Sequence, residues 1–318
     1  MNESSFLILG ASNVGKTALL ASFFYAVRAL RQKDFLFDMR WQPQNEPTRE
    51  IARNAVRFLQ QGQLPFQGTS SIVEYEFLLE LVESKRRFFA LQKNTILSRF
   101  RFIDAPGGAF FTNDEEEIDY AVMGEHRHRL ISELKTAKGL IICVDLSELN
   151  APTQTRCHGG LMYNQLADIF SHAPALDGKK QAMSYLSVER VFIALNKCDL
   201  WAVQEGFRGE AQEELQKRSP FMLFHELLGD GMINTLRTWL APTTKIAIGC
   251  TSSFGFIDGG PNAPLMNGVS FGPDLRAEEI GAWQPYQVFD PFLFLASGKR
   301  TSSNVVQCTV EELDSKVG

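Results

Sequence analysis

The chain has 318 residues, enough for one decorated α/β domain, with 44% hydrophobic residues, 22% charged residues and a formal net charge of −5. This acidic balance argues against a general nucleic-acid binder and against a protein that coats anionic membranes. No apolar run approaches the roughly 20 residues of a membrane span, and no basic leader precedes the first expected strand. We therefore expect a cytoplasmic protein without a transmembrane segment or a signal peptide.

The cysteines are odd in number, widely spaced and without a C-x-x-C pair. This pattern is typical of reduced thiols and fits neither a disulfide framework nor a zinc site. The five cysteines are Cys143, Cys157, Cys198, Cys250 and Cys308.

Strand-like and helix-like segments alternate along the chain, which predicts an α/β fold with a mostly parallel central sheet flanked by helices. The apolar runs expected to form strands lie at residues 6–9, 71–82, 96–103, 139–145, 191–196 and 245–249. Helical spacing of apolar residues predicts helices at residues 16–32, 48–61, 163–172, 210–217, 221–240 and 286–296. Pro291 fits the last of these helices only if it lies in the first turn.

The sequence has no internal repeat, and we expect one elaborated domain over residues 1–298. An insert at about residues 33–66 separates the first expected helix from the second expected strand. Residues 257–284 are rich in glycine, proline and asparagine, which is typical of a long surface insertion. Residues 299–318 are polar and predict a loose C-terminal tail.

The first motif is G-A-S-N-V-G-K-T at residues 10–17, between an expected strand and an expected helix. It fits the pattern G-x-x-x-x-G-K-[ST], in which glycines let the backbone wrap around phosphates. Lys16 would reach the β- and γ-phosphates, and the Thr17 hydroxyl would ligate Mg²⁺. Backbone N–H groups of the loop and of the helix N-terminus would face the anion. The residues expected to hold the nucleotide here are Gly10, Ser12, Asn13, Val14, Gly15, Lys16, Thr17 and Ala18.

The second motif is D-A-P-G, which ends an apolar strand at Asp104. A carboxylate at this end of a strand can hold Mg²⁺ through water, and the N–H of Gly107 can contact the γ-phosphate. This loop would then act as a nucleotide-dependent switch.

The third motif is N-K-C-D at the end of the strand 191–196, and it predicts a guanine reader. The Asp199 carboxylate can accept hydrogen bonds from guanine N1–H and the N2 amine, whereas adenine offers no such pair of donors. The Lys197 stem would cover the base, and Asn196 would tie this loop to the phosphate loop. Ser252 and Ser253, in the turn after the strand 245–249, fit the last base-contacting loop, although an ordinary strand-end turn explains them equally well.

In this order, the four motifs resemble the G domain of the TRAFAC class of P-loop GTPases over roughly residues 5–256. The resemblance implies a Ras-like domain with GTP or GDP as its ligand and Mg²⁺ as its cofactor. It also implies a switch I threonine that ligates Mg²⁺; we assign Thr69, which precedes the strand leading towards Asp104, with Thr48 as the weaker candidate. The insert and the segment L-P-F-Q-G-T resemble bacterial double-GTPase families linked to conflict or defence operons.

Ras-like enzymes place a glutamine after D-x-x-G to orient the attacking water, and here that position is Gly108. Asn13 resembles the asparagine of Era-like, tRNA-modifying and ferrous-iron-transporter G domains, several of which bind K⁺ through it. A K⁺ at Asn13 could neutralise charge that develops between the β- and γ-phosphates. The alternative is that Asn13 only accommodates the backbone conformation of the loop.

These observations predict a GTP-binding protein that hydrolyses GTP slowly unless a partner or K⁺ assists it. Lys16, Thr69, Asn13 and the Gly107 N–H are the expected catalytic groups, and a protein partner or a second GTPase would contact the switch regions. Two alternatives stay open: a nearly inert GTP-binding module that recruits a partner, and a P-loop phosphotransferase. No nucleic-acid partner is expected.

Overall fold

A computed structural model gives the fold of the chain. It describes residues 5–11, 14–29, 37–61, 73–87, 90–104, 120–150, 166–167, 170–171, 185–207, 210–257, 260–261, 265–266, 269–270, 285–299, 302–313 and 315. Within these segments, no helix combines the length and the apolar character that crossing a membrane requires.

The central sheet has the order β1-β5-β6-β7-β12 in the described part of the chain. The first four strands run parallel, and the last pairs antiparallel with β7. Near-continuous apolar runs form the parallel strands because both of their faces are covered. The strands are β1 (Ser5–Leu9), β5 (Ala137–Asp145), β6 (Arg190–Asn196), β7 (Lys245–Cys250) and β12 (Val306–Thr309).

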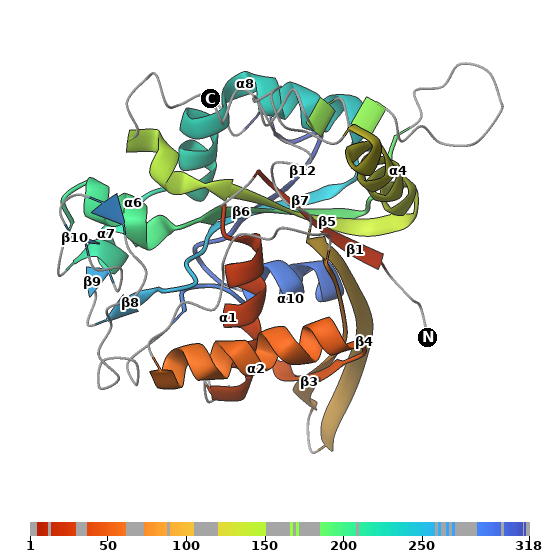
Figure 1. Ribbon diagram of the computed structural model, residues 1–318, viewed down its shortest axis with the longest axis horizontal. Helices are drawn as coiled ribbons and strands as arrows, with labels where there is room; N and C mark the ends of the chain where they lie inside the picture. Colours follow the sequence, from red (N-terminus) through yellow and green to blue (C-terminus); the bar gives the residue numbers. More distant parts are fainter. Residues whose placement is uncertain are drawn as a thin grey trace.

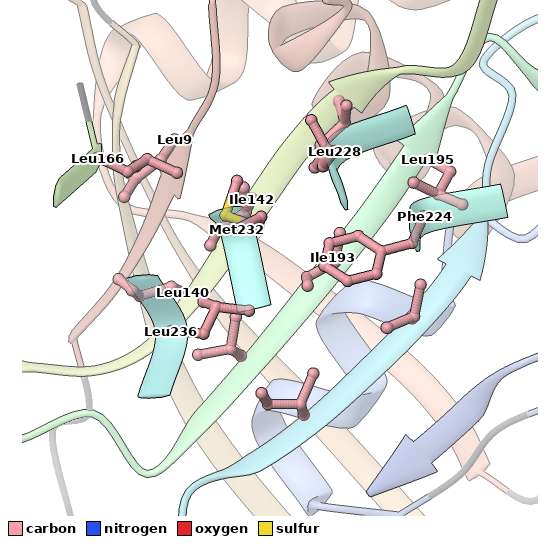
Figure 2. Packing of buried hydrophobic residues seen from close by; sticks show 14 of the residues in the cluster. Leu9, Leu140, Ile142, Leu166, Ile193, Leu195, Phe224, Leu228, Met232 and Leu236 are labelled. Atoms are coloured by element: carbon pink, nitrogen blue, oxygen red, sulfur yellow. The ribbon is translucent and has the colours of Figure 1, made fainter. Parts of the chain in front are cut away.

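Helices cover both faces of this sheet, as Figure 1 shows. The helices α4 (Tyr120–Thr136) and α8 (Pro220–Trp239) lie on one face, and α1 (Lys16–Ala29) and α10 (Asp290–Ser297) lie on the other. Figure 2 shows side chains of α8 pointing at the sheet. The residues labelled in this layer are Leu9, Leu140, Ile142, Leu166, Ile193, Leu195, Phe224, Leu228, Met232 and Leu236. This is an α/β architecture with a mostly parallel central sheet flanked by helices.

A second, antiparallel sheet of order β2-β3-β4 packs below the first. Alternate residues of β3 are buried, so one face of this sheet joins the core, whereas the residues between them are half-buried. The strands are β2 (Phe37–Pro43), β3 (Val73–Arg87) and β4 (Ala90–Asp104), and α2 (Glu46–Gln61) packs against α1 and β3. The rings of Phe6 in β1 and Phe100 in β4 stack with centroids 4.5 Å apart, which joins the two sheets.

Phenylalanines fill the space between the second sheet, α1 and α10. The ring of Phe292 stacks on Phe23 at 4.0 Å and lies 5.8 Å from Phe102, 5.9 Å from Phe100 and 6.3 Å from Phe77. Edge and stacked contacts of this kind add stability beyond the area that they bury. The phenylalanines of α10 are therefore core residues.

Most elements follow the sequence pattern, with informative differences. Pro291 lies in the first turn of α10, where its missing N–H costs no hydrogen bond. The strand β2 was not predicted, because it lies inside the expected insert. We expected a loose tail after residue 298, but β12 pairs with β7, and neighbouring apolar side chains are buried. These buried residues are Val305, Cys308, Val310 and Leu313.

The remaining described elements lie around the loops. They are the 3-10 helix η1 (Leu146–Asn150), the helices α6 (Cys198–Gln204) and α7 (Ala211–Lys217), and the short strands β8 (Phe256–Ile257), β9 (Gly260–Pro261), β10 (Leu265–Met266) and β11 (Val269–Ser270). Most of the expected helix at 163–172 and most of the expected surface insertion at 257–284 lie outside the described residues. The single-domain division over residues 1–298 stays a proposal.

The aromatic cluster predicts a large loss of stability when Phe292 is truncated. Phe292→Ala leaves a cavity between the two sheets and should lower the free energy of unfolding by about 3–5 kcal/mol. Met222→Ala is the matched control, since Met222 is 54% exposed on α8. Urea unfolding measures both, and equal stabilities for the two variants would contradict this account of the core.

Candidate functional site

The candidate site lies where the parallel strands end. Because β1, β5, β6 and β7 run in the same direction, the loops that follow them meet at one edge of the sheet. The phosphate loop follows β1, Asp145 ends β5, Asn196 ends β6 and Thr251 follows β7. Motifs that are distant in the sequence therefore form one site.

The described part of the phosphate loop holds Lys16 close to the backbone. The Lys16 ammonium donates to the carbonyl oxygens of Gly10 at 3.0 Å and Ala11 at 2.8 Å, and the residue is 8% exposed. Gly10 has φ of +154°, and a Cβ there would lie 2.6 Å from the carbonyl oxygen of Cys143. Only glycine fits this approach of the loop to β5. Thr17 and Ala18, in the first turn of α1, are partly exposed.

Asn196 connects three loops of the site. Its amide nitrogen donates to the carbonyl oxygen of Val14 at 2.9 Å, and its side-chain oxygen accepts a hydrogen bond from the Thr251 hydroxyl. Asn196 is 3% exposed, so these bonds are shielded from water. The predicted tie between the base loop and the phosphate loop is confirmed, and Thr251 is a partner that we did not predict.

Asp199 is a buried carboxylate in the first turn of α6 and is 2% exposed. Burial raises its pKa to about 6, while hydrogen bonds from the Ser252 hydroxyl and from the N–H of Leu200 act in the opposite direction. A buried carboxylate needs donors, and two N–H groups of a ligand would supply them.

The two serines after β7 have different environments. The Ser252 hydroxyl accepts hydrogen bonds from the N–H groups of Phe254 at 3.2 Å and Gly255 at 2.7 Å, besides donating to Asp199. The Ser253 hydroxyl accepts one from Ser22 of α1 at 3.4 Å. Ser252 thus shapes the turn and orients Asp199, and Ser253 lies beside α1.

Lys197 carries two unusual features. Its ammonium lies 2.5 Å from a carboxylate oxygen of Asp145, and its backbone is left-handed with φ of 59° and ψ of 34°. Near this pair, Glu148 is partly buried in η1. Burial, and secondly the negative charge of Asp145, raises the pKa of Glu148 to about 7, with Lys197 acting in the opposite direction.

Thiols lie under the base loop. Burial raises the pKa of Cys198 well above its ordinary value and that of Cys250 to about 12. Both stay protonated at neutral pH, and none of the four cysteines among the described residues forms a disulfide. The thiols pack as small apolar groups.

Several predicted site residues lie outside the described part of the chain. These are Ser12, Asn13, Thr69, Gly107 and Gly108. The backbone of Asp104 ends β4, opposite Val73 of β3, as the D-x-x-G pattern predicts. The side chain of Asp104 is not among the described ones.

The assignment of Thr48 as the weaker candidate for a Mg²⁺ ligand is wrong. Its hydroxyl donates to Asn45 at 2.6 Å and accepts from the N–H of Glu76 at 2.7 Å, and the residue is fully buried. Asn45 also donates to the carbonyl oxygen of Glu74 at 2.7 Å. Thr48 and Asn45 therefore anchor the start of α2 to β3.

The residues that could hold Mg²⁺ have suitable chemistry. Thr17 at the start of α1 offers a hydroxyl, and Asp104 offers a carboxylate at a strand end. Hard cations such as Mg²⁺ use few protein oxygens together with substrate phosphates. A Mg²⁺ site of this kind does not require a cluster of three His, Cys, Asp or Glu side chains. The described residues contain no such cluster.

No protein-family model and no curated protein matches the sequence. The solved structures that match this chain include GTPases. The S. cerevisiae Ski7 GTPase-like domain bound to GTP is 13% identical with a TM-score of 0.32, and the match covers 79% of this chain and 43% of that chain.

Two further matches have similar values. The small COPII coat GTPase SAR1 from Encephalitozoon cuniculi, in complex with GDP, is 14% identical with a TM-score of 0.27, covering 73% of this chain and 61% of that chain. The bacterial selenocysteine-specific elongation factor EF-Sec is 18% identical with a TM-score of 0.24, and the match covers 65% of this chain and 22% of that chain. The chain thus spans less than two thirds of each of these proteins. These TM-scores are too low to show that the chain belongs to a family.

Glu148 predicts how stability depends on pH. An ordinary glutamate has a pKa of 4.5, whereas folding raises that of Glu148 to about 7. Between these values the folded protein binds more protons than the unfolded chain, so this group lowers the free energy of unfolding as the pH rises. When the pH is raised from about 5 to about 8, the free energy of unfolding of Glu148→Gln should therefore increase by about 1–2 kcal/mol relative to that of wild type.

Urea unfolding at both pH values measures this difference. The titration of Asp199 is common to both proteins and cancels in the comparison. Glu226→Gln, an exposed change on α8, is the control and should follow wild type at both pH values. A difference between Glu148→Gln and wild type that does not change with pH would contradict the assignment.

Proposed function

We propose that the protein binds GTP and GDP and hydrolyses GTP, acting as a molecular switch. The observation that carries this proposal is the buried Asp199 carboxylate at the carboxyl edge of the sheet, on a loop that Asn196 ties to the phosphate loop. Guanine supplies the N1–H and N2 amine donors that this carboxylate needs. Besides the donors that Ser252 and Leu200 already supply, adenine would offer this carboxylate no such pair of donors, which is a basis for discrimination.

In the proposed reaction, protein groups position the phosphates while water attacks in line. Lys16 reaches the β- and γ-phosphates, the N–H groups from residue 10 to residue 18 contact them, and the N–H of Gly107 contacts the γ-phosphate. Thr17, Asp104 and Thr69 would hold Mg²⁺, which neutralises phosphate charge when bound. Asn196, Lys197, Asp199, Ser252 and Ser253 would form the base site.

Gly108 cannot orient the attacking water, because it has no side chain. We therefore propose slow hydrolysis that depends on K⁺ at Asn13 or on a partner that contacts the switch regions. The second candidate function is a GTP-loaded module with almost no turnover, which Gly108 favours. A cytoplasmic role in a bacterial conflict, defence or signalling system, as in double-GTPase families, is the cellular context we propose.

Asp199→Asn tests the nucleotide specificity. Its side-chain amide would face the guanine N2 amine donor to donor, whereas xanthine offers an oxygen at that position. We expect GDP affinity to fall at least about 100-fold and xanthosine diphosphate to become the preferred ligand. Calorimetry with GDP, ADP and xanthosine diphosphate measures this. Tight ADP binding by wild type would refute the guanine assignment.

The same titrations report the charge of Asp199. Its carboxylate must be ionised to accept both hydrogen bonds, and its pKa is about 6. GDP affinity of wild type should therefore fall below about pH 6, by up to tenfold for each pH unit.

Hydrolysis in different salts tests the role of Asn13. If K⁺ occupies the loop, GTP turnover should be at least about tenfold faster in KCl than in NaCl of equal ionic strength, and Asn13→Ala should remove the difference. Equal rates in both salts would reject the K⁺ hypothesis. Turnover close to zero in both salts, with normal GTP binding, would favour the inert module.

A further inference from the structure

Asp145 lies directly beside the base loop. In the register of the parallel pair β5 and β6, it is opposite Asn196, so its side chain reaches the next residue, Lys197. Asp145 is itself largely buried. It belongs to none of the four sequence motifs.

Both oxygens of the Asp145 carboxylate have partners. One oxygen accepts from the N–H of Ser147 at 3.0 Å and from the Ser147 hydroxyl at 2.5 Å. The other lies 2.5 Å from the Lys197 ammonium. Because Ser147 fixes one side of the carboxylate, the other side presents a defined position to the lysine.

The backbone of Lys197 shows why such an anchor matters. A left-handed conformation costs a residue other than glycine about 1–2 kcal/mol, and such strain persists only where neighbouring contacts impose it. The Lys197 carbonyl oxygen accepts from the N–H of Trp201 at 3.0 Å, which fixes the start of α6. The ion pair with Asp145 fixes the ammonium of the same residue. Both the backbone of Lys197 and the far end of its side chain are therefore held.

We propose that Asp145 is a positioning residue for nucleotide recognition, acting through Lys197. It holds the ammonium to one side, so that the four-carbon stem of Lys197 stays over the face of the bound guanine. This inference rests on the proposed function. Asp145 itself touches no part of the nucleotide.

A double-mutant cycle tests the proposal. The variants are Asp145→Asn, Lys197→Met and the double variant, with the dissociation constant for GDP measured by calorimetry. Met keeps an unbranched stem and removes the ammonium, and Asn keeps the shape of Asp145 and removes its charge. We expect Asp145→Asn alone to weaken GDP binding by about 3- to 10-fold. In the Lys197→Met background the same change should have no effect.

The control is a second ion pair between the same two strands. Lys138, near the start of β5, lies 3.3 Å from Glu189, which immediately precedes β6 at the opposite edge of the sheet. Glu189→Gln removes a comparable charge and should leave GDP affinity unchanged. Asp145→Glu restores the negative charge and should recover most of the affinity, which also covers the case in which Asp145→Asn does not fold.

The outcomes separate this inference from the proposed function. If wild type does not bind GDP, the proposed function fails, and this inference fails with it. If wild type binds GDP but Asp145→Asn binds equally well, or weakens binding equally with and without Lys197, only the inference is overturned. If Asp145→Asn does not fold and Asp145→Glu binds GDP as weakly as Lys197→Met does, the proposed role of the Asp145 charge is also rejected.

Discussion

The spacing between the two halves of the site depends on the side chain of Asn196. The proposed binding of one nucleotide across both halves requires a fixed distance between the phosphate loop and the base loop, although both are irregular backbone. The Asn196 amide bonds the carbonyl oxygen of Val14, and its oxygen accepts from Thr251, so three loops share one buried anchor. Removing one partner would leave a buried polar group without its bond, so the arrangement resists local change.

The hydrophobic layers make this anchor effective. The parallel strands are buried on both faces, by α8 and its neighbours on one side and by the aromatic cluster around Phe292 on the other. Close-packed cores deform little, so the strand ends keep their relative positions. The charged and strained groups, Asp199, Lys197 and Asp145, lie just beyond this rigid part. Polar chemistry is thus placed on loops whose ends are fixed by packing.

Much of this arrangement is predictable from the sequence, because apolar strands and phosphate-binding glycines have strong local patterns. The N-K-C-D motif predicted that Asn196 would tie its loop to the phosphate loop, and the bond from Asn196 to Val14 confirms this tie. Asp145 was missed because its role arises from register: only pairing of β5 with β6 brings it to Lys197. Thr48 was misjudged because its burial depends on how α2 docks on β3, which no local pattern encodes. The strand character of residues 306–309 likewise depends on a partner, β7.

The central claim is that one guanine nucleotide spans this edge, with its base at Asp199 and its phosphates at residues 10–17. A crystal structure of the protein with GDP and Mg²⁺ tests this most directly. The account predicts the Asp199 carboxylate within hydrogen-bonding distance of guanine N1 and N2, and the Lys16 ammonium at the β-phosphate. Nucleotide bound elsewhere on the protein, or a base at this edge that makes no contact with Asp199, would contradict it.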